Sequence, residues 1–236
     1  MSRLPPFHTR TSLTTSLRCA EFRQPATFSP MIVAIDGPAG AGKSTVARAV
    51  AQTLSFTYLD TGAMYRCVAL ARINDSECDP DSLEIELGDA IKLNGEDVSD
   101  AIRTPEVTEL ASQVAAEASV RAAMATRQAA LLAEGDWVAE GRDIGTVIAP
   151  RAELKIFLTA DPEERARRRA EQTGRDLSEI LAEQQDRDRR DGERSLSPLI
   201  AAEDAVQLDT TTLSADEVIV RIAELATAAI KSGGSQ

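Results

Sequence analysis

The chain is poor in the side chains that most enzymes and metal sites use. It has one histidine, His8, and three cysteines, Cys19, Cys67 and Cys78, which form no C-x-x-C pair. Catalysis and metal binding by histidine are therefore effectively excluded, and the odd cysteine count argues against a disulfide framework or a zinc site. A reducing compartment is the default, so we expect the protein in the cytoplasm. Its chemistry must rest on carboxylates, arginines and groups that bind phosphate.

Basic charge, long apolar runs and aromatic residues are also scarce. Lys and Arg number 26 against 38 Asp and Glu, and the formal net charge of −12 argues against a general nucleic-acid partner. No apolar run reaches the roughly 20 residues that span a membrane, so we expect no membrane partner. Aromatic residues are only 3% of 236, so Ala, Val, Leu and Ile must fill the core of a chain of one domain's length.

The first 30 residues differ in composition from the rest of the chain. They hold four arginines, one glutamate and several serines and threonines, and they show no periodic apolar face. We interpret residues 1–30 as a disordered extension or an over-extended start before Met31. The alternative is an organelle transit peptide, since such segments are rich in arginine and serine and poor in acidic residues.

A glycine-rich stretch after this extension reads G-x-x-x-x-G-K-S, from Gly37 to Ser44. It follows the apolar run 31–35, which suits a buried strand, and precedes residues 45–51, which suit a helix. Strand, loop and helix in this order are the context of a P-loop. Glycines let backbone N–H groups turn toward phosphate oxygens, and the start of a helix adds unpaired N–H groups and a positive dipole end. We expect Lys43 to contact the β- and γ-phosphates of a nucleoside triphosphate, and the Ser44 hydroxyl to bind Mg²⁺.

Further strands and helices alternate along the chain and predict an α/β fold with a parallel sheet flanked by helices. The expected strands are residues 56–59, 137–139, 154–158 and 206–209. The dipeptide Asn94-Gly95 predicts a hairpin, and hence a small antiparallel insert. Residues 101–134 read as an alanine-rich helical stretch, in which Leu110, Val114 and Ala118 are spaced for one face. On this pattern Ser112 and Arg121 read as ordinary solvent-facing residues.

Polar residues follow two of the expected strands, where a parallel sheet presents its ligand loops. Thr61 and Arg66 suit a phosphate other than the one on the P-loop, although Asp-Thr-Gly alone is more often a helix cap. Residues 140–145 place a charged triplet between glycines directly after a buried strand, which is an unusual pattern for packing.

Arginines gather in two helical segments after residue 161. Arg165 and Arg169 lie one helical turn apart in the first segment, and residues 187–194 form the second group. Interleaved surface ion pairs are one interpretation, but such pairs contribute little to stability. Beside a P-loop, we favour a lid that closes over phosphates and neutralises their charge.

Seven motifs, in the family's order, resemble those of the bacterial-type cytidylate (CMP) kinases within the nucleoside monophosphate kinases. The resemblance covers Met31 to about Ala229, and the motifs are Ile35-Asp36-Gly37-Pro38, Leu59-Asp60-Thr61-Gly62-Ala63-Met64-Tyr65-Arg66, Leu93-Asn94-Gly95-Glu96-Asp97-Val98-Ser99, Ile102-Arg103-Thr104-Pro105-Glu106-Val107, Ala111-Ser112-Gln113-Val114-Ala115, Glu140-Gly141-Arg142-Asp143-Ile144-Gly145-Thr146-Val147 and Arg187-Asp188-Arg189-Arg190-Asp191.

The resemblance implies a P-loop NTPase fold with a monophosphate-binding insert and an arginine-rich lid, and ATP-dependent phosphorylation of CMP and dCMP with Mg²⁺. It implies a kinase domain over 31–230, with the insert at about 74–104 and the lid at about 162–194, and we expect a flexible tail at 231–236 and a monomer. The insert looks shorter than in the longer family members. The family's functional residues carry over by position: Thr61, Arg66, Arg142 and Arg194 for the acceptor phosphate, Ser112, Arg121 and Asp143 for the cytosine edge, and Arg187 and Asp191 for the sugar. The P-loop pattern itself assigns ATP to Gly37, Pro38, Ala39, Gly40, Ala41, Gly42, Lys43, Ser44 and Thr45, and Mg²⁺ to Ser44. For catalysis we expect Lys43 together with Arg165 or Arg169, either of which could reach the transferred phosphate from the lid.

Two other classes of protein share the P-loop. The nearest alternative is another small-molecule P-loop kinase, which would act on a different nucleoside monophosphate or on a metabolite. A regulatory P-loop protein is the second alternative. It is disfavoured because the chain has no N-K-x-D motif of a GTPase and no apolar strand that ends in adjacent Asp and Glu.

Overall fold

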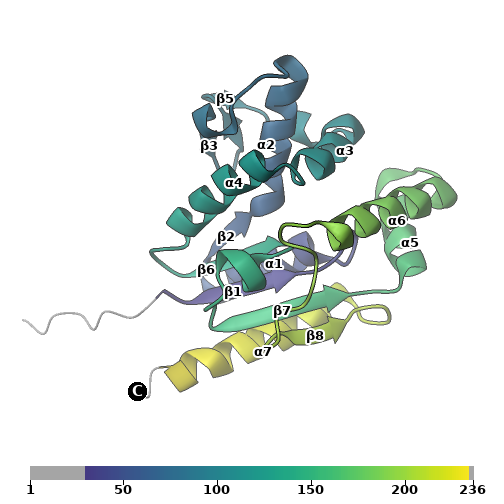
Figure 1. Cartoon of the computed structure of the whole chain (residues 1–236). Helices are drawn as coiled ribbons and strands as arrows, with labels where there is room; N and C mark the ends of the chain where they lie inside the picture. Colours follow the sequence, from purple (N-terminus) through teal and green to yellow (C-terminus); the bar gives the residue numbers. More distant parts are fainter. Residues whose placement is uncertain (1–29, 234–236) are drawn as a thin grey trace, which may run out of the picture.

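The computed structural model describes residues 30–233, so the extension predicted over 1–30 lies outside the described residues except for Pro30. Its centre is a five-stranded sheet in the order β2-β6-β1-β7-β8 (Figure 1). The strands are β2 (Thr57–Asp60), β6 (Trp137–Gly141), β1 (Ile32–Asp36), β7 (Leu154–Thr159) and β8 (Val206–Asp209). Every pairing is parallel, which confirms the predicted α/β class and brings the loops after all five strands to one edge of the sheet.

Helices cover both faces of this sheet because side chains alternate along its strands. Val33 and Ile35 of β1 pack against α1 (Lys43–Leu54) and α7 (Ala215–Gly233) on one face. Ala34, between them, belongs to a smaller cluster on the other face, with Ile144 of the π-helical turn η3 (Ile144–Ile148). The second face is built largely from alanines, which lets the η3 turn approach the strands closely.

The predicted hairpin is confirmed. Strands β4 (Lys92–Leu93) and β5 (Glu96–Asp97) pair antiparallel, and β3 (Ile85–Glu86) adds a third strand. Asn94 and Gly95 both have a positive φ, of 52° and 84°, as a two-residue hairpin turn of type I′ requires.

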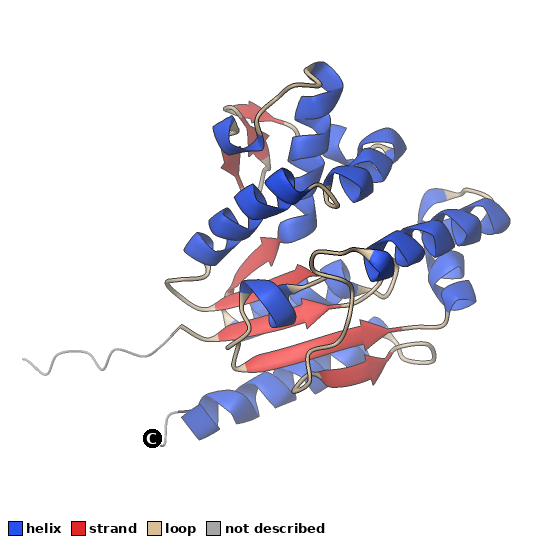
Figure 2. Cartoon of the chain, in the orientation of Figure 1, coloured by secondary structure: helices blue, strands red, loops and turns tan. Residues whose placement is uncertain are grey.

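The small sheet joins three helices to form what we call the small lobe (residues 61–131). The helices are α2 (Thr61–Asn74), α3 (Pro105–Val114) and α4 (Ala118–Leu131), with short turns at η1 (Pro80–Ser82) and η2 (Ala101–Arg103). The lobe has its own core, centred on Met64, Ile102 and Met124. In Figure 2 it stands apart from the red strands of the main sheet.

The single helical stretch predicted over residues 101–134 is wrong. The chain leaves the helix at residues 115–117, so α3 and α4 are separate and run in different directions. Ala118 starts the second helix and is exposed, whereas Val114 is buried, so the two do not share one buried face. The start of α3 follows its sequence signals, since Pro105 is the first helical residue and the Thr104 hydroxyl accepts from Val107 N–H.

Helices α5 (Pro162–Thr173) and α6 (Leu177–Glu193) form an arginine-rich hairpin, which we call the lid. Gly174 turns the chain between them with a φ of 67°. Figure 1 shows the lid beyond the carboxyl end of β7, with α6 beneath the small lobe. The two meet where Arg190 of α6 pairs with Glu109 of α3 at 2.9 Å.

The closing helix begins at the capping box that the sequence predicts. The Ser214 hydroxyl accepts from Glu217 N–H at 3.3 Å, and the Glu217 carboxylate accepts from Ser214 N–H at 2.8 Å. The helix continues to Gly233, so residues 231–233 extend α7 into the segment predicted as a tail. Within residues 30–233, none of the helices combines the length and apolar character needed to cross a bilayer.

We expect Ile222→Ala to lower the free energy of unfolding by about 2–5 kcal/mol, because it empties a site at the centre of the α1–α7 core. Ile222 is 0% exposed, whereas Val220 on the opposite face of α7 is 56% exposed. Val220→Ala is therefore the matched control and should change stability by less than about 0.5 kcal/mol. Denaturant unfolding measures both variants, and equal losses would contradict the packing of α7.

Candidate active site

The loop between β1 and α1 has the backbone that a P-loop needs. Gly37 has a φ of 147°, and a Cβ there would lie 2.1 Å from the carbonyl oxygen of Leu158, so no other residue fits without moving β7. Gly42 is the N-cap of α1, with a φ of 88°. Lys43 follows it and is buried, and its ammonium donates to the Pro38 carbonyl at 2.6 Å. The loop therefore curls around the lysine as the sequence predicts.

Two arginines from other parts of the fold, Arg142 and Arg187, lie close enough to Lys43 to affect its charge. Burial lowers the pKa of Lys43 well below its ordinary value, and the nearby guanidinium groups of Arg142 and Arg187 lower it further. Glu140 opposes this effect. An anion bound between these cations would stabilise the charged lysine, so the site is electrostatically prepared for phosphate.

Glu140 is a site residue that the sequence analysis did not assign. It is the penultimate residue of β6, beside the P-loop strand, and its carboxylate accepts from the Ser44 hydroxyl at 3.0 Å and from the Tyr58 hydroxyl. Burial, followed by the negative charge of Asp60, raises its pKa. Its position as the first charged residue after an apolar strand is the signal that could have found it.

Asp60 and Thr61 fill the start of α2. The Asp60 carboxylate accepts from Ala63 N–H at 2.9 Å, so the helix-cap interpretation of this motif is confirmed. The same carboxylate pairs with Arg66 at 2.9 Å, and the Thr61 hydroxyl donates to the Glu140 carbonyl at 2.6 Å. The cap therefore also orients Arg66.

Three arginines surround one carboxylate at the junction of the main sheet, the small lobe and the lid, and a fourth, Arg66, lies near one of them, Arg187. We call Arg66, Arg142, Arg187 and Arg194 the arginine cluster. Asp191 of α6 is 1% exposed and accepts from Arg142 Nε at 2.8 Å and from Arg194 Nη2. Burial alone would raise the pKa of Asp191, but Arg142 and Arg194 outweigh it and hold the pKa below its usual range.

The arginine cluster retains hydrogen-bonding capacity. The Nε atoms of Arg66, Arg187 and Arg194 are buried and have no partner. Burial and the charge of Arg142 lower the pKa of Arg187 to about 10. Buried donors without partners are costly unless a ligand accepts from them, and several convergent guanidinium donors suit a phosphate.

Ser112 and Arg121 are buried, so the pattern-based prediction that they face solvent is wrong. Ser112 is one of four buried residues of α3, so its polar side chain did not indicate exposure. The break at residues 115–117 reorients α4 relative to α3, and a helical period carried across it therefore assigns Arg121 to the wrong face. Arg121 Nη1 pairs with Asp143 Oδ2 at 2.6 Å, and its guanidinium lies 5.6 Å from the centre of the Tyr65 ring. The Ser112 hydroxyl is buried without a partner. The fold thus brings together Arg121 and Asp143, two of the three residues that the resemblance assigns to the base.

Arg165 is the lid arginine that reaches the P-loop. It is 4% exposed, donates to the Ala39 carbonyl at 2.9 Å and pairs with Asp188 of α6 at 2.7 Å. Arg169, one turn later, is exposed. The structure therefore distinguishes two arginines that the sequence left equivalent.

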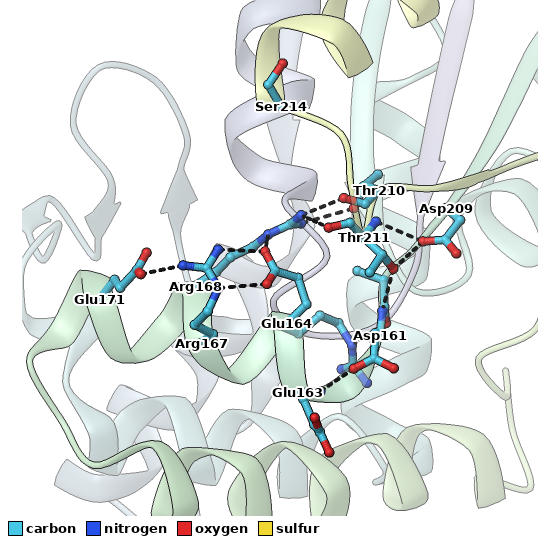
Figure 3. Close-up of polar contacts among 12 residues, drawn as sticks. Asp161, Glu163, Glu164, Arg167, Arg168, Glu171, Asp209, Thr210, Thr211 and Ser214 are labelled. Carbon is cyan, nitrogen blue, oxygen red and sulfur yellow. Dashed lines mark hydrogen bonds and ion pairs between the residues drawn. The ribbon is translucent and has the colours of Figure 1, made fainter.

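Two further arginines of α5 have structural contacts: Arg168 anchors the helix to the loop after β8, and Arg167 forms ion pairs along the helix. Figure 3 shows Arg168 extending from α5 to the loop after β8, where its guanidinium donates to the Thr210 carbonyl at 2.5 Å and the Thr210 hydroxyl at 3.1 Å. Arg167 pairs with Glu164 and Glu171 along the helix. The arginine-rich composition of α5 therefore supplies both a buried cation beside the P-loop and a contact that fixes the helix to the loop after β8.

Comparison with known proteins assigns this arrangement to a family. The sequence matches the family described as "Cytidylate kinase" over residues 33–228. The chain belongs to the cytidylate kinase family. A curated cytidylate kinase from Exiguobacterium sibiricum is 48% identical over 218 residues, which cover 84% of this chain and 98% of the relative. Another, from Halalkalibacterium halodurans, is 50% identical over 208 residues, covering 80% and 93% of the two chains.

The fold of this cytidylate kinase family member also has a counterpart among solved structures. An uncharacterized protein from Eubacterium ventriosum matches 84% of this chain and 98% of its own, with a TM-score of 0.51 and 12% identity. This likeness concerns the fold alone. The family resemblance drawn from the seven sequence motifs is confirmed.

In this cytidylate kinase family member, we expect Arg165→Ala to lower the turnover number for phosphoryl transfer at least about 100-fold, because it removes a buried cation beside the P-loop. Arg169→Ala, its matched control on the same helix, should lose less than about tenfold. Steady-state assays at saturating substrates measure both variants. Similar losses would show that the lid does not select Arg165.

Proposed function

We propose that the protein transfers the γ-phosphoryl group of ATP to CMP and dCMP, giving CDP and dCDP. The observation that best supports this reaction is the adjacency of two phosphate-binding sets, since Arg142 and Arg187 of the arginine cluster lie close enough to Lys43 to lower its pKa. A P-loop that only hydrolysed its nucleotide would need no second set. Membership of the cytidylate kinase family supports ATP as the donor and does not favour another P-loop kinase.

On the donor side, residues 37–45 would wrap the triphosphate, with Lys43 at its β- and γ-phosphates. Mg²⁺ fits here because the Ser44 hydroxyl and the Glu140 carboxylate, which are both oxygen groups, lie 3.0 Å apart. No group of three or more His, Cys, Asp or Glu within residues 30–233 could hold a metal alone, which suits an ion that takes further ligands from phosphate and water. When bound, Mg²⁺ neutralises charge on the phosphates.

On the acceptor side, Thr61 and three members of the arginine cluster, Arg66, Arg142 and Arg194, would hold the monophosphate. A monophosphate has a second pKa of about 6, so its attacking oxygen is already ionised near neutral pH. The reaction therefore needs no strong general base, in agreement with a chain that has one histidine. The reaction still requires that the ATP triphosphate and the acceptor phosphate be aligned and that water be excluded. The arginines would align the two phosphates, and the lid would exclude water.

Arg121, Asp143 and Ser112 would read the base. Cytosine presents an amino group at C4, which donates, where uracil presents a carbonyl, which accepts. The Asp143 carboxylate, held 2.6 Å from Arg121, can accept from the cytosine amino group but would repel the uracil carbonyl. Arg187 and Asp191 would contact the sugar.

An assay with ATP, Mg²⁺ and each of CMP, dCMP, UMP, AMP and GMP tests the proposed reaction. We expect a kcat/KM for CMP and dCMP at least about tenfold above that for UMP, in line with one hydrogen-bond match or mismatch, and no transfer by Lys43→Ala. Comparable turnover of UMP would retain a nucleotide kinase but contradict the base-reading residues. Release of free phosphate without transfer, or full activity of Lys43→Ala, would overturn the P-loop kinase proposal.

We expect Asp143→Ala to lower kcat/KM for CMP by about 100-fold and to change the KM for ATP by less than about twofold, because it removes a charged acceptor on the base side alone. Discrimination between CMP and UMP should fall with it. Glu86→Ala is the control, because Glu86 also pairs with a cation, Lys92, at 3.2 Å, but lies in the small sheet outside the site. Equal losses for CMP and UMP would show that Asp143 is structural.

A further inference from the structure

The last residue of β1, Asp36, has a buried carboxylate that none of the roles above uses. It is 5% exposed and directly precedes Gly37, the first residue of the P-loop. Its Oδ1 accepts from Ile144 N–H at 2.9 Å and its Oδ2 from Gly145 N–H at 2.8 Å. One side chain of the donor strand therefore holds two consecutive peptide groups of the loop that follows β6.

That loop carries the base-reading carboxylate. Asp143 directly precedes the two peptide groups, and its own carbonyl accepts from Val147 N–H at 2.9 Å to close the η3 turn. The Asp143 side chain pairs with Arg121 of α4. The position of Asp143 is therefore set by the small lobe through its side chain and by Asp36 through its backbone.

Gly145 shows how closely the turn is held. A Cβ on Gly145 would lie 3.2 Å from Cδ of Lys155 and 3.4 Å from Oδ2 of Asp36, so the turn is packed between these two side chains. The Lys155 ammonium continues to the Pro150 carbonyl at 2.6 Å, at the far end of the turn. The residues between Asp143 and Pro150 therefore have little freedom to shift.

Burial destabilises the charged form of the Asp36 carboxylate. Burial raises its pKa to about 6, against the effect of the two N–H donors, and the charge of Asp143 adds to the rise while Lys43 opposes it. A charge that burial penalises is a poor contributor to stability. Its two well-directed hydrogen bonds indicate a role in geometry.

We propose that Asp36 is a positioning residue for base recognition, which fixes the backbone of residues 144 and 145 so that Asp143 meets the cytosine edge at a set place relative to the P-loop. The inference rests on the proposed function. It gives the P-loop strand a second task, because the same β1 terminus that starts the donor loop also sets the acceptor's specificity.

Asp36→Ala and Asp36→Asn test the proposal in the CMP and UMP assays. Asp36→Ala should lower the ratio of kcat/KM for CMP to that for UMP by about tenfold, and change the KM for ATP by less than about threefold. Asp36→Asn should fall between this variant and the wild type, because its amide keeps one acceptor oxygen. Glu153→Ala is the matched control, since the Glu153 carboxylate also accepts from a backbone N–H of β1, that of Ile32, at 2.8 Å, but at the opposite end of the strand. It should leave the ratio unchanged.

Gly145→Ala keeps the proposal testable where an Asp36 variant fails to fold. It displaces the same turn and leaves the carboxylate in place, so it should lower the CMP-to-UMP ratio as Asp36→Ala does. In the substrate-free wild type, the amide signals of Ile144 and Gly145 should titrate with a midpoint near pH 6, and this titration should vanish in Asp36→Asn. The charges that face Asp36 there are Asp143, Lys43 and, across Gly145, the Lys155 side chain.

The outcomes separate the two proposals. A wild type without CMP kinase activity would overturn the proposed function. An active wild type whose Asp36 and Gly145 variants lose CMP and UMP turnover equally would overturn the positioning role alone, and so would amide signals of Ile144 and Gly145 that Asp36→Ala leaves unchanged.

Discussion

The structure depends on placing many guanidinium groups side by side inside a protein of net negative charge. Asp191 makes this possible, because it lies buried between Arg142 and Arg194 and offsets part of their repulsion. Asp191, together with Asp60, the partner of Arg66, still leaves the Nε atoms of Arg66, Arg187 and Arg194 without an acceptor, and these donors suit a ligand of high negative charge. The cluster therefore has an excess of positive charge and donors without acceptors, which a substrate phosphate would neutralise and bind.

The parallel sheet determines where this cluster forms. The ends of β1, β2 and β6 deliver the P-loop, the start of α2 and the loop after Glu140 to one edge, and their polar residues interlock there. The lid follows β7 at the same edge, where Arg165 contacts the P-loop and Arg168 contacts the loop after β8. Both contacts lie in the first part of α5, so this end of the lid is held in place beside the P-loop.

Much of this arrangement could be predicted from short-range signals. The P-loop, the Asn94-Gly95 hairpin and the Ser214 capping box each depend on a few adjacent residues, and all three formed as predicted. The helical pattern gave the wrong result where a buried face had to be assigned across two helices, as for Arg121. The three-residue break between α3 and α4 changes the direction of the chain, so the spacing of apolar residues in α3 does not indicate which face of α4 is buried. Glu140 and the choice between Arg165 and Arg169 depend on which strands and helices become neighbours, and local pattern carries no such information. The family resemblance supplied Arg121 and Asp143 where periodicity could not.

The small lobe has a hydrophobic core separate from the two that flank the main sheet. Cooperative units in proteins follow such divisions, so the two halves of the site need not melt together. Partial unfolding that starts in the lobe would release Arg66, Ser112 and Arg121 while the P-loop stayed folded on β1 and α1. Under mild heat or denaturant, the proposed monophosphate site would then unfold before the proposed triphosphate site. The partly unfolded protein would still bind a nucleoside triphosphate but could not bind an acceptor to phosphorylate.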